Sequence, residues 1–357
     1  MRIVHVLHSH GYGGAENHAL VLMKGQRAAG HEVLFAGPTD SWLGRACVDN
    51  GIPTLHLRMS GLFDLPSHFT LRRLLRRWHA DVVHGHLVRG AQYAGLAGHR
   101  HQRPVAICTA HATTAAKHME RCAHIIAVSG AVQQNLLKHG YSRDGVSVIY
   151  NGMPDGPKVD RAAIRAELNI PADQLAIVNV GRFIHDKGQD LLVQAMTTLP
   201  CPEAHLYLIG DPDTDFGRAI QAQTKAGGSG STRIHFLGYR SDVQRILPAF
   251  DLYALSSRRE ALGLSVIEAF SAQLPVVATR VGGVPEIVLH DDTGWLVDPE
   301  SPEALTAGLA QLCHDPALRV KLGERGRRFY EARLTDRSMV EQTLLIYQRY
   351  LDRARHA

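Results

Sequence analysis

Short apolar runs alternate with helix-forming stretches along the whole chain. Runs of about four to eight residues that are rich in β-branched side chains are typical of buried strands, whereas apolar residues spaced three and four apart predict amphipathic helices. In the first half, the pattern predicts a helix over 17–31 and strands within residues 1–10, 32–38, 81–87, 104–111 and 124–129. Strands separated by helices of this length indicate βαβ units and therefore a parallel sheet.

The same alternation begins again after a junction at residues 151–161, which is rich in Gly, Pro and Asp, as a linker is. Here the pattern predicts a helix over 188–199 and strands within residues 176–183, 204–211, 233–239, 251–257, 275–281 and 294–298. Residues 226–232 (AGGSGST) offer few side chains that could pack, and we expect a mobile surface loop there.

The fold class that follows is α/β, with two Rossmann-like, doubly wound parallel-sheet domains that face a cleft. We expect the first domain over residues 1–155 and the second over 162–335. The last segment, about 338–357, has the spacing of a long amphipathic helix, and we expect it to pack back on the first domain. Ligands of doubly wound sheets bind beyond the carboxyl ends of the strands, so the candidate site should lie where the strands end.

Composition narrows the class of protein only slightly. A chain of 357 residues is long enough for two domains, and its 45% hydrophobic content supports a sizeable core. The sequence has no run of 18 apolar residues, so it predicts no membrane-spanning helix. Its first residues also lack the apolar segment and cleavage site of a signal peptide. The five cysteines show no paired short spacing, which indicates a reduced protein of the cytoplasm.

Positive charge is concentrated in the first half. Residues 1–160 hold 17 Lys and Arg against 10 Asp and Glu, a net charge of +7, whereas residues 161–357 hold 22 against 24. Such a half suits an anionic partner, such as an acidic membrane surface or a phosphorylated acceptor, and a merely solvated basic surface is the alternative. Nucleic acid is not an expected partner, because the basic stretches lack interleaved aromatic residues.

Residues 70–80 predict a helix with one apolar face and one basic face. The apolar positions are Leu71, Leu74, Leu75 and Trp78, and the basic positions are Arg72, Arg73, Arg76 and Arg77. The pattern fits a helix packed on the core with a solvated face, or a peripheral and purely electrostatic contact with the inner face of the cell membrane.

Two glutamates stand eight positions apart in the stretch SSRREALGLSVIEAF, at Glu260 and Glu268. Ser265 and Glu268 fit the Ser-x-x-Glu capping box, in which Glu268 would only satisfy backbone N–H groups. Alternatively, a helix starting near Leu264 would offer free N–H groups to a phosphate, with Gly263 allowing close approach. Glu268 would then accept hydrogen bonds from ribose hydroxyls and Glu260 from groups beyond the phosphates, which indicates a nucleotide sugar.

Two cations, Arg182 and Lys187, follow the apolar strand run AIVNVG at 176–181. At the carboxyl end of a parallel strand they suit a diphosphate, because Arg offers a planar fork of donors and Lys a point charge. Side chains that only solvate the turn are the alternative.

Several segments resemble one enzyme family. SSRREALGLSVIEAF is similar to the Glu-x7-Glu signature of the retaining GT-B glycosyltransferases of family 4, or glycosyl transferases group 1, and GRFIHDKG is similar to that family's Gly-Arg and Lys-Gly step. The segments GYGGAE, VIYNGM, FLGYRSDV and PVVATRVGGVPEIV also match, in order and over nearly the whole chain. Gln273 stands where members often have glycine, a departure that we expect to affect packing more than chemistry.

The resemblance implies a retaining, metal-independent enzyme without a cofactor. It would move a hexose-type sugar from a nucleoside diphosphate sugar, with UDP the first choice, to a hydroxyl group. The implied acceptor is a cell-envelope glycan or lipid-linked glycan, such as lipopolysaccharide or exopolysaccharide.

The resemblance also implies roles for single residues. Arg182 and Lys187 would bind the donor diphosphate and Glu260 the transferred sugar, and Glu16 and His111 would lie on the acceptor side, with His111 near the reacting centre. Further donor contacts are implied for Gly14 at the diphosphate, Gly238, Tyr239 and Arg240 at the base, Leu264 and Ser265 at the phosphates, and Glu268 at the ribose.

Two other classes of function remain open from the sequence. Gly11, Gly13 and Gly14 suggest the dinucleotide loop of an NAD-dependent oxidoreductase, but Glu16 stands where the third glycine belongs and would repel a pyrophosphate. A catalytically silent nucleotide-sugar-binding partner would keep the same motifs.

Two groups of residues raise the question of a metal, and we expect none. Asp211 and Asp213 resemble the metal motif of another glycosyltransferase fold, but two acids in a turn are more often Asx-turn formers. Five histidines lie at predicted strand ends, and we expect one or two to face the substrate and the rest to be structural: His8, His10, His84, His86 and His111.

Overall fold

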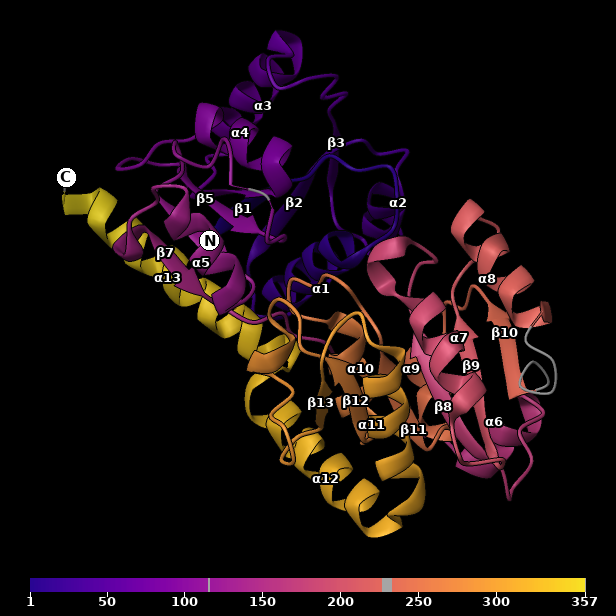
Figure 1. The fold of residues 1–357 in the computed structure, drawn as a ribbon. Coiled ribbons are helices and arrows are strands. Elements are labelled where there is room, and N and C mark those ends of the chain that lie inside the picture. Colours follow the sequence, from indigo (N-terminus) through magenta and orange to yellow (C-terminus); the bar gives the residue numbers. More distant parts are fainter. Residues whose placement is uncertain (115, 227–232, 357) are drawn as a thin grey trace. The chain divides into compact units, whose positions relative to one another are not determined.

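The computed structural model describes residues 1–114, 116–226 and 233–356 of the chain. Most of the segment expected as a mobile loop, 226–232, lies outside the described residues. The chain divides into two compact units (Figure 1), which we call unit 1 (Met1–Pro154 with Leu334–Ala357) and unit 2 (Asp155–Arg333). The last helix of the chain therefore belongs to the first unit.

The described part of unit 1 forms a seven-stranded parallel sheet in the order β3-β2-β1-β4-β5-β6-β7. Its strands are β1 (Arg2–Val6), β2 (Glu32–Gly37), β3 (Thr54–His56), β4 (Val82–His86), β5 (Val105–Ala110), β6 (His124–Ala127) and β7 (Val146–Val148). The sequence pattern predicted five of these. The strands β3 and β7 are three residues long, too short for a periodic pattern to be detected.

Helices cover this sheet and supply much of its core. They are α1 (Gly14–Ala28), α2 (Trp42–Asp49), α3 (Leu65–Arg77), α4 (Leu87–Ala97), α5 (Gly130–Lys138) and α13 (Asp336–His356). Helix α13, drawn in yellow in Figure 1, packs on the sheet, with Met339, Ile346 and Tyr347 buried against Ile3 and Val105. The expectation that the terminal helix packs back on the first domain is confirmed.

The described part of unit 2 forms a six-stranded parallel sheet in the order β10-β9-β8-β11-β12-β13. Its strands are β8 (Leu175–Val180), β9 (Ala204–Ile209), β10 (Ile234–Gly238), β11 (Leu252–Leu255), β12 (Val276–Thr279) and β13 (Trp295–Val297). All six were predicted. Both sheets are buried on both faces, which explains why their strands read as continuous apolar runs.

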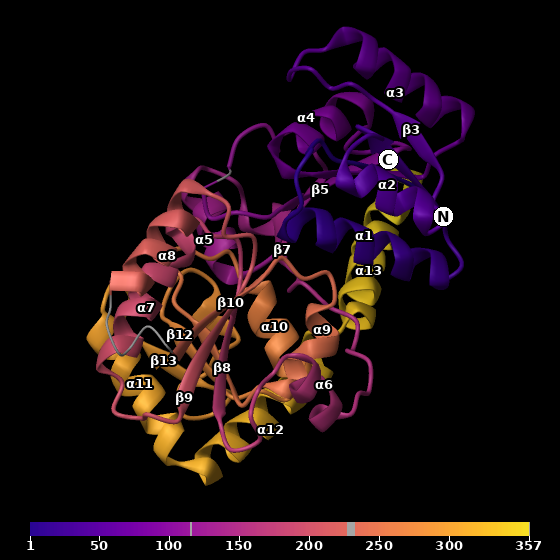
Figure 2. The same ribbon diagram turned by 90° about the vertical axis from the view of Figure 1, so that its right-hand side faces the viewer.

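The helices of unit 2 lie on both sides of its sheet (Figure 2). They are α6 (Arg161–Glu167), α7 (Gln189–Thr198), α8 (Asp215–Ala226), α9 (Val243–Ile246), α10 (Leu264–Ser271), α11 (Pro302–His314) and α12 (Pro316–Arg333). In Figure 2, α7, α8 and α11 cover one face of the sheet and α10 the other. No helix among the residues described has the combination of length and apolar character needed to cross a bilayer.

Helix starts fall into two groups, and the difference positions the candidate site. Eight of the described helices have a side chain that caps the first turn, namely Ser41, Asp64, Ser129, Asp160, Thr214, Ser301, Asp315 and Thr335. The other described helices have no side-chain cap: α4 and α9 start after His86 and Asp242, whereas α1, α7 and α10 start after Gly13, Gly188 and Gly263. Their first N–H groups thus remain available to a ligand.

The backbone conformation at Gln273 explains why family members often have glycine at this position. Gln273 lies just beyond the end of α10 and adopts φ 59°, in the left-handed region where glycine carries no steric penalty. The departure is therefore a matter of local backbone conformation at a helix end.

Candidate active site

The strand order of unit 2 reverses once, between the neighbouring strands β8 and β11 at the centre of its sheet. Counted within the unit, the order is 3-2-1-4-5-6, so the crossovers on the two sides of β8 and β11 run in opposite directions. Ligands of doubly wound sheets bind at this switch point, beyond the carboxyl ends of the two strands. Arg182 and Lys187 lie in the loop after β8, and Glu260 in the loop after β11.

Two of the predicted site residues meet in an ion pair at this switch point. Lys187 Nζ lies 2.5 Å from Glu260 Oε1, and the Ser257 hydroxyl donates to the same carboxylate oxygen at 3.0 Å. Only 9% of the Glu260 side chain is exposed. The pair orients both side chains, and neither is a freely solvated turn residue.

The backbones of the two loops are also held together. Arg258 N–H donates to the carbonyl of Asp186 at 2.8 Å, and the Arg258 guanidinium pairs with both carboxylate oxygens of Asp190. Gly188 adopts φ 63°, and a Cβ there would lie 2.1 Å from the carbonyl oxygen of Ser256. Glycine is thus required where the loops approach each other most closely.

Arg182 has a different environment. Its carbonyl accepts hydrogen bonds from the Gln189 side chain and from Ile184 N–H, which fixes the backbone. Its guanidinium is exposed, and no residue in the described ranges accepts a hydrogen bond from it. A fork of donors is therefore free to meet an anion beside the Lys187–Glu260 pair.

Helix α10 overturns the capping-box interpretation of Glu268. The helix starts at Leu264, as the alternative had it, after Gly263 at φ 99°. Ser265 lies inside the first turn, and no described side chain caps the helix. The left-handed glycine ends the preceding loop, so the chain needs no serine cap.

The Glu268 side chain is partly exposed and has no donor in the described part of the chain. Among the described residues, none donates a hydrogen bond to its carboxylate, and burial raises the pKa of that carboxyl to about 7. A desolvated carboxyl group is unfavourable unless something satisfies it. Glu268 is thus prepared to accept hydrogen bonds from a ligand hydroxyl.

The third predicted segment of unit 2 follows β10. Gly238 has φ 68° with no atom within 4 Å of the position that a Cβ would take, and Tyr239 is exposed. Arg240 is held by Asp242 at 2.8 Å and Glu167 at 3.3 Å. Since the Arg240 side chain is tied back, the backbone of the turn and the exposed Tyr239 are the groups accessible to a ligand.

Asp211 and Asp213 form the turn that the simpler alternative predicted. Asp213 N–H donates to Asp211 Oδ1 at 3.0 Å, which is an Asx turn, and the Asp213 carboxylate pairs with Arg218.

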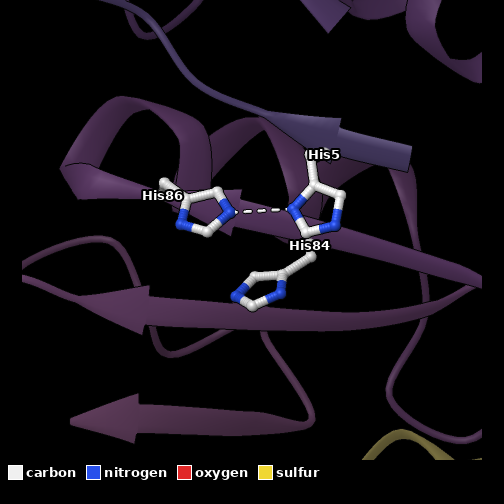
Figure 3. A group of neighbouring side chains, drawn as sticks. All are labelled: His5, His84 and His86. Carbon is white, nitrogen blue, oxygen red and sulfur yellow. Dashed lines mark hydrogen bonds between the residues drawn. The ribbon is translucent and has the colours of Figure 1, made fainter. Parts of the chain in front are cut away.

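In unit 1, the predicted residues lie at the strand ends of the first sheet. Gly14 is the first residue of α1, Glu16 is buried in its first turn, and His111 follows β5. His111 Nε2 lies 3.2 Å from His86 Nδ1, and His86 Nε2 lies 2.9 Å from His5 Nδ1. Figure 3 shows the second of these contacts, with the ring of His84 stacked beside that of His86.

Burial keeps these rings neutral. Desolvation lowers the pKa of His5 and of His18 to about 4, and it places the pKa values of His84, His86 and His111 well below the ordinary value. Each ring therefore carries a single N–H and one acceptor nitrogen.

Two groups of three histidines have the spacing of metal ligands, with ring nitrogens within 4.8 Å of one another. In His5, His84 and His86 the rings of His84 and His86 are stacked at 17°, so their in-plane lone pairs do not converge on one point. In His18, His86 and His111 the rings are inclined, but His86 Nδ1 and His111 Nε2 face each other as a hydrogen-bonded pair. We assign His5, His84, His86 and His111 to one hydrogen-bond network, and His18 packs beside it with neither ring nitrogen hydrogen-bonded among the described residues.

The structure groups the histidines differently from the sequence. It joins His84, His86 and His111 as expected, but His8 and His10 lie edge-on to each other and His8 contacts Arg89. The members that sequence reasoning missed are His5 and His18, which sit within a strand and a helix. It also missed Ser257 in unit 2, and the only signal for Ser257 was its place in the Ser256–Glu268 stretch.

Together, the strand order and the polar groups at the strand ends define a doubly wound α/β protein, and comparison with known proteins defines its family. The family model for glycosyl transferases group 1 matches residues 160–329, and the model for Glycosyltransferase Family 4 matches residues 12–155. The chain belongs to this family of GT-B glycosyltransferases and is a glycosyltransferase.

The relatives include two proteins of Rhizobium meliloti (strain 1021). The lipopolysaccharide core biosynthesis glycosyltransferase LpsE is 31% identical over 57% of this chain and 57% of its own length, and LpsD is 25% identical over 98% of both chains. The D-inositol 3-phosphate glycosyltransferase of Corynebacterium glutamicum (strain R) is 31% identical over 68% of this chain and 66% of its own. The chain thus spans little more than half of some curated relatives.

Solved structures share the fold. Anabaena Alr3699/HepE, in complex with UDP and glucose, superposes with a TM-score of 0.84 at 21% identity over 98% of this chain and 99% of its own. WaaG, a glycosyltransferase involved in lipopolysaccharide biosynthesis, superposes with a TM-score of 0.73 at 18% identity over 97% and 99%.

The buried histidines predict acid sensitivity. An unfolded histidine has a pKa of about 6.5, so between pH 6.5 and about 4 the unfolded chain binds protons that buried His5, His18 and His124 do not. Stability should be fully present above pH 6.5 and fall as the pH drops towards 4, by up to about 3 kcal/mol for each histidine.

Denaturant unfolding at pH 7 and pH 4.5 measures this loss. The variant His124→Gln should lose less stability on acidification than the wild type, and His79→Gln, at an exposed position, controls for loss of an imidazole. Equal pH dependence in wild type and His124→Gln would contradict the assignment.

Proposed function

We propose that this glycosyltransferase is a retaining enzyme that moves a hexose-type sugar from a nucleoside diphosphate sugar to a hydroxyl of a cell-envelope glycan or glycolipid. The observation that carries the proposal is the arrangement at the switch point of unit 2. Three features surround the uncapped start of α10 there. They are the Lys187–Glu260 pair, the unpaired guanidinium of Arg182, and the carboxyl of Glu268, which accepts no hydrogen bond from a described residue. Anion-binding donors flanked by two carboxylates match a ligand with phosphates between two hydroxyl-bearing ends.

UDP is the proposed nucleotide. The fold neighbour from Anabaena has been solved with UDP and with UDP-glucose, which supports a uridine donor. Lipopolysaccharide is the proposed class of acceptor, because the relatives LpsE and LpsD are named for lipopolysaccharide core biosynthesis. Exopolysaccharide is the second acceptor class.

The donor roles follow the chemistry of each group. Arg182 and Lys187 bind the diphosphate, with backbone N–H groups of Leu264 and Ser265, and Glu268 accepts hydrogen bonds from the ribose. Glu260 contacts the transferred sugar, and the backbone of residues 238–240 faces the base. Glu260 is oriented for that task by the cation that neutralises it.

Charge on the leaving diphosphate is stabilised without a metal in this proposal. Arg182, Lys187 and the N-terminus of α10 supply preorganised positive charge where negative charge develops. We propose departure and attack on the same face of the sugar, since no side chain offers itself as a covalent nucleophile at the described site. The anomeric configuration of the product tests retention.

In unit 1, Gly14 is proposed to contact the diphosphate, and Glu16 and His111 to act on the acceptor side. Gly14 leads an uncapped helix, and His111 is the partly exposed end of a buried network.

Helix α3 is the proposed contact with an anionic membrane surface, and with it we propose a cytoplasmic protein bound at the inner leaflet. Leu71 and Leu75 are buried, as expected for a helix packed on the core. The sequence predicted an electrostatic contact alone, but Phe63, Leu65 and Phe69 near the helix start are 72%, 75% and 62% exposed. Apolar side chains beside a basic face suit insertion at the headgroup level as well as attraction to anionic lipid.

The first prediction from this proposal concerns the two cations, Arg182 and Lys187, that are proposed to bind the diphosphate. A thermal-shift comparison of UDP-, GDP-, ADP- and TDP-sugars first identifies the donor. With that donor, Arg182→Ala and Lys187→Ala should each lower kcat/KM by an amount that corresponds to about 2–4 kcal/mol of lost transition-state stabilisation. Chelation by EDTA should leave the rate nearly unchanged. Arg259→Ala, a neighbouring cation paired with Asp186, is the matched control. Wild-type turnover in both site variants, or strict dependence on Mn²⁺, would overturn the proposal.

The second prediction separates the two glutamates. Glu268→Gln should weaken binding of free UDP, because the carboxylate meets the ribose, whereas Glu260→Gln should leave UDP binding nearly intact and reduce transfer. Titration calorimetry with UDP and a transfer assay measure the two effects. Equal losses of UDP affinity would show that the two ends of the donor have been assigned wrongly.

The third prediction concerns α3. Binding to anionic vesicles should weaken with salt, because exposed charges are screened over about 8 Å at physiological ionic strength. Arg73→Gln with Arg76→Gln and Arg77→Gln should reduce binding most at low salt, and Phe63→Ser with Phe69→Ser should reduce the part that persists at high salt. Co-sedimentation with vesicles of graded anionic content measures both. No binding at low salt would return α3 to a solvated surface helix.

A further inference from the structure

We propose that a one-directional chain of hydrogen bonds, from Tyr347 and Gln26 through His5 and His86, fixes the tautomer of His111 and leaves its Nδ1 lone pair open to the acceptor hydroxyl. The inference rests on the proposed function, in which His111 serves the acceptor side. Gln26, Tyr347, His5 and His86 are then positioning residues, which act only through His111.

The chain is continuous in the structure. Gln26 Nε2 donates to the Tyr347 hydroxyl at 3.3 Å, and Gln26 Oε1 lies 2.8 Å from His5 Nε2. His5 Nδ1 lies 2.9 Å from His86 Nε2, as Figure 3 shows, and His86 Nδ1 lies 3.2 Å from His111 Nε2. Every member except His111 is buried.

The direction of the chain follows from the amide. An amide oxygen only accepts, so His5 Nε2 must carry its proton, and the neutral ring then has an acceptor at Nδ1. His86 must therefore donate through Nε2 and accept at Nδ1, and His111 must donate through Nε2. Each neutral imidazole has one N–H, so the Nδ1 of His111 is left with a lone pair.

Tyr347 orients the amide when its hydroxyl donates to His84 Nδ1, because its oxygen is then left to accept from Gln26. Its hydroxyl accepts from Gln26 Nε2 and contacts His84 Nδ1, while His84 Nε2 lies 2.7 Å from the Thr109 hydroxyl. A rotated Gln26 amide would reverse every donor along the chain and move the His111 proton to Nδ1. The two orientations therefore predict opposite tautomers of a ring three links away.

The open end of the chain is suited to a substrate. His111 is partly exposed, and no described residue donates to its Nδ1. His18 lies edge-on to the His111 ring at 78°, with ring centroids 4.8 Å apart, which holds the plane of the ring. A correctly oriented acceptor nitrogen is thus presented at the surface of unit 1, where it can accept a hydrogen bond from a hydroxyl.

The direct test is the tautomer itself. Nitrogen-15 NMR of the full-length protein labelled in histidine should show His111 with a protonated Nε2 and an unprotonated Nδ1 at pH 7.5. The His111→Gln variant identifies which signals belong to this ring. A His111 ring protonated at Nδ1 would overturn the inference, because the chain would then run the other way.

A matched pair of variants tests whether the chain sets that tautomer. Tyr347→Phe removes the hydroxyl that orients Gln26, whereas Tyr350→Phe removes a hydroxyl from the same helix that bonds His124 at 2.9 Å, outside the chain. Tyr347→Phe should give a mixture of His111 tautomers and lower kcat about two- to tenfold, since part of the population keeps the productive form. Its donor KM and UDP affinity should be unchanged, and Tyr350→Phe should resemble the wild type in all of these.

Gln26→Leu is a second way to break the chain and should repeat the result of Tyr347→Phe. Unaltered tautomer and kcat in both Tyr347→Phe and Gln26→Leu would refute the inference, as would equal effects of Tyr347→Phe and Tyr350→Phe, which would point to docking of α13 instead. Absence of sugar transfer by the wild type would instead refute the proposed function, while the tautomer measured by NMR would still test the chain.

Discussion

The candidate donor site depends on one constraint, which is the reversal of crossover direction between β8 and β11. Because neighbouring crossovers leave in opposite directions, no helix covers the carboxyl ends of these two strands, and two loops meet there. The Lys187–Glu260 pair and the bonds from Arg258 join the loops after β8 and β11. The same strand order in unit 1 brings the glycine-rich loop after β1 beside the end of β4.

Capping divides the helices by task. Eight of the described helices start with a serine, threonine or aspartate that satisfies one of their first N–H groups, as Ser41 and Ser301 do. Helices α1, α7 and α10 begin after glycine beyond the carboxyl ends of β1, β8 and β11, so their first N–H groups and the positive end of their dipoles stay available. What would be a defect in a structural helix becomes an anion-binding feature at the site.

The buried histidines of unit 1 depend on hydrogen-bond partners from several elements. Burying several imidazoles in a sheet is unfavourable unless each finds partners, and His5, His84 and His86 find them in Gln26, Tyr347, Thr109 and one another. The terminal helix contributes one of those partners, so its docking adds both apolar burial and a hydroxyl to the network. Glu268 in unit 2 shows the contrasting case of a partly exposed carboxyl with a raised pKa, to which no described residue donates a hydrogen bond.

The sequence by itself determined the features that depend on local patterns of residues, namely most strands and the positions of the candidate donor-site residues. Periodicity predicted all six strands of unit 2 and five in unit 1, and the flanking glycines and charges placed Arg182, Lys187, Glu260 and Glu268 at strand or helix ends. Those are effects of burial and turn formation over a few residues. Strands of three residues, such as β3, leave no such pattern, and a Ser-x-x-Glu spacing looked like a cap because the left-handed Gly263 cannot be read from spacing alone.

Only the tertiary structure decided which side chains meet. The Lys187–Glu260 pair joins residues 73 positions apart, His84 reaches Tyr347 across 263 positions, and Gln26 reaches it across 321. No local pattern encodes such partners, because they are chosen by the order of strands in the sheet and by where α13 docks. The sequence therefore defined the fold and the groups offered for chemistry, whereas their pairing, and with it the tautomer of His111 that we infer, depends on long-range packing.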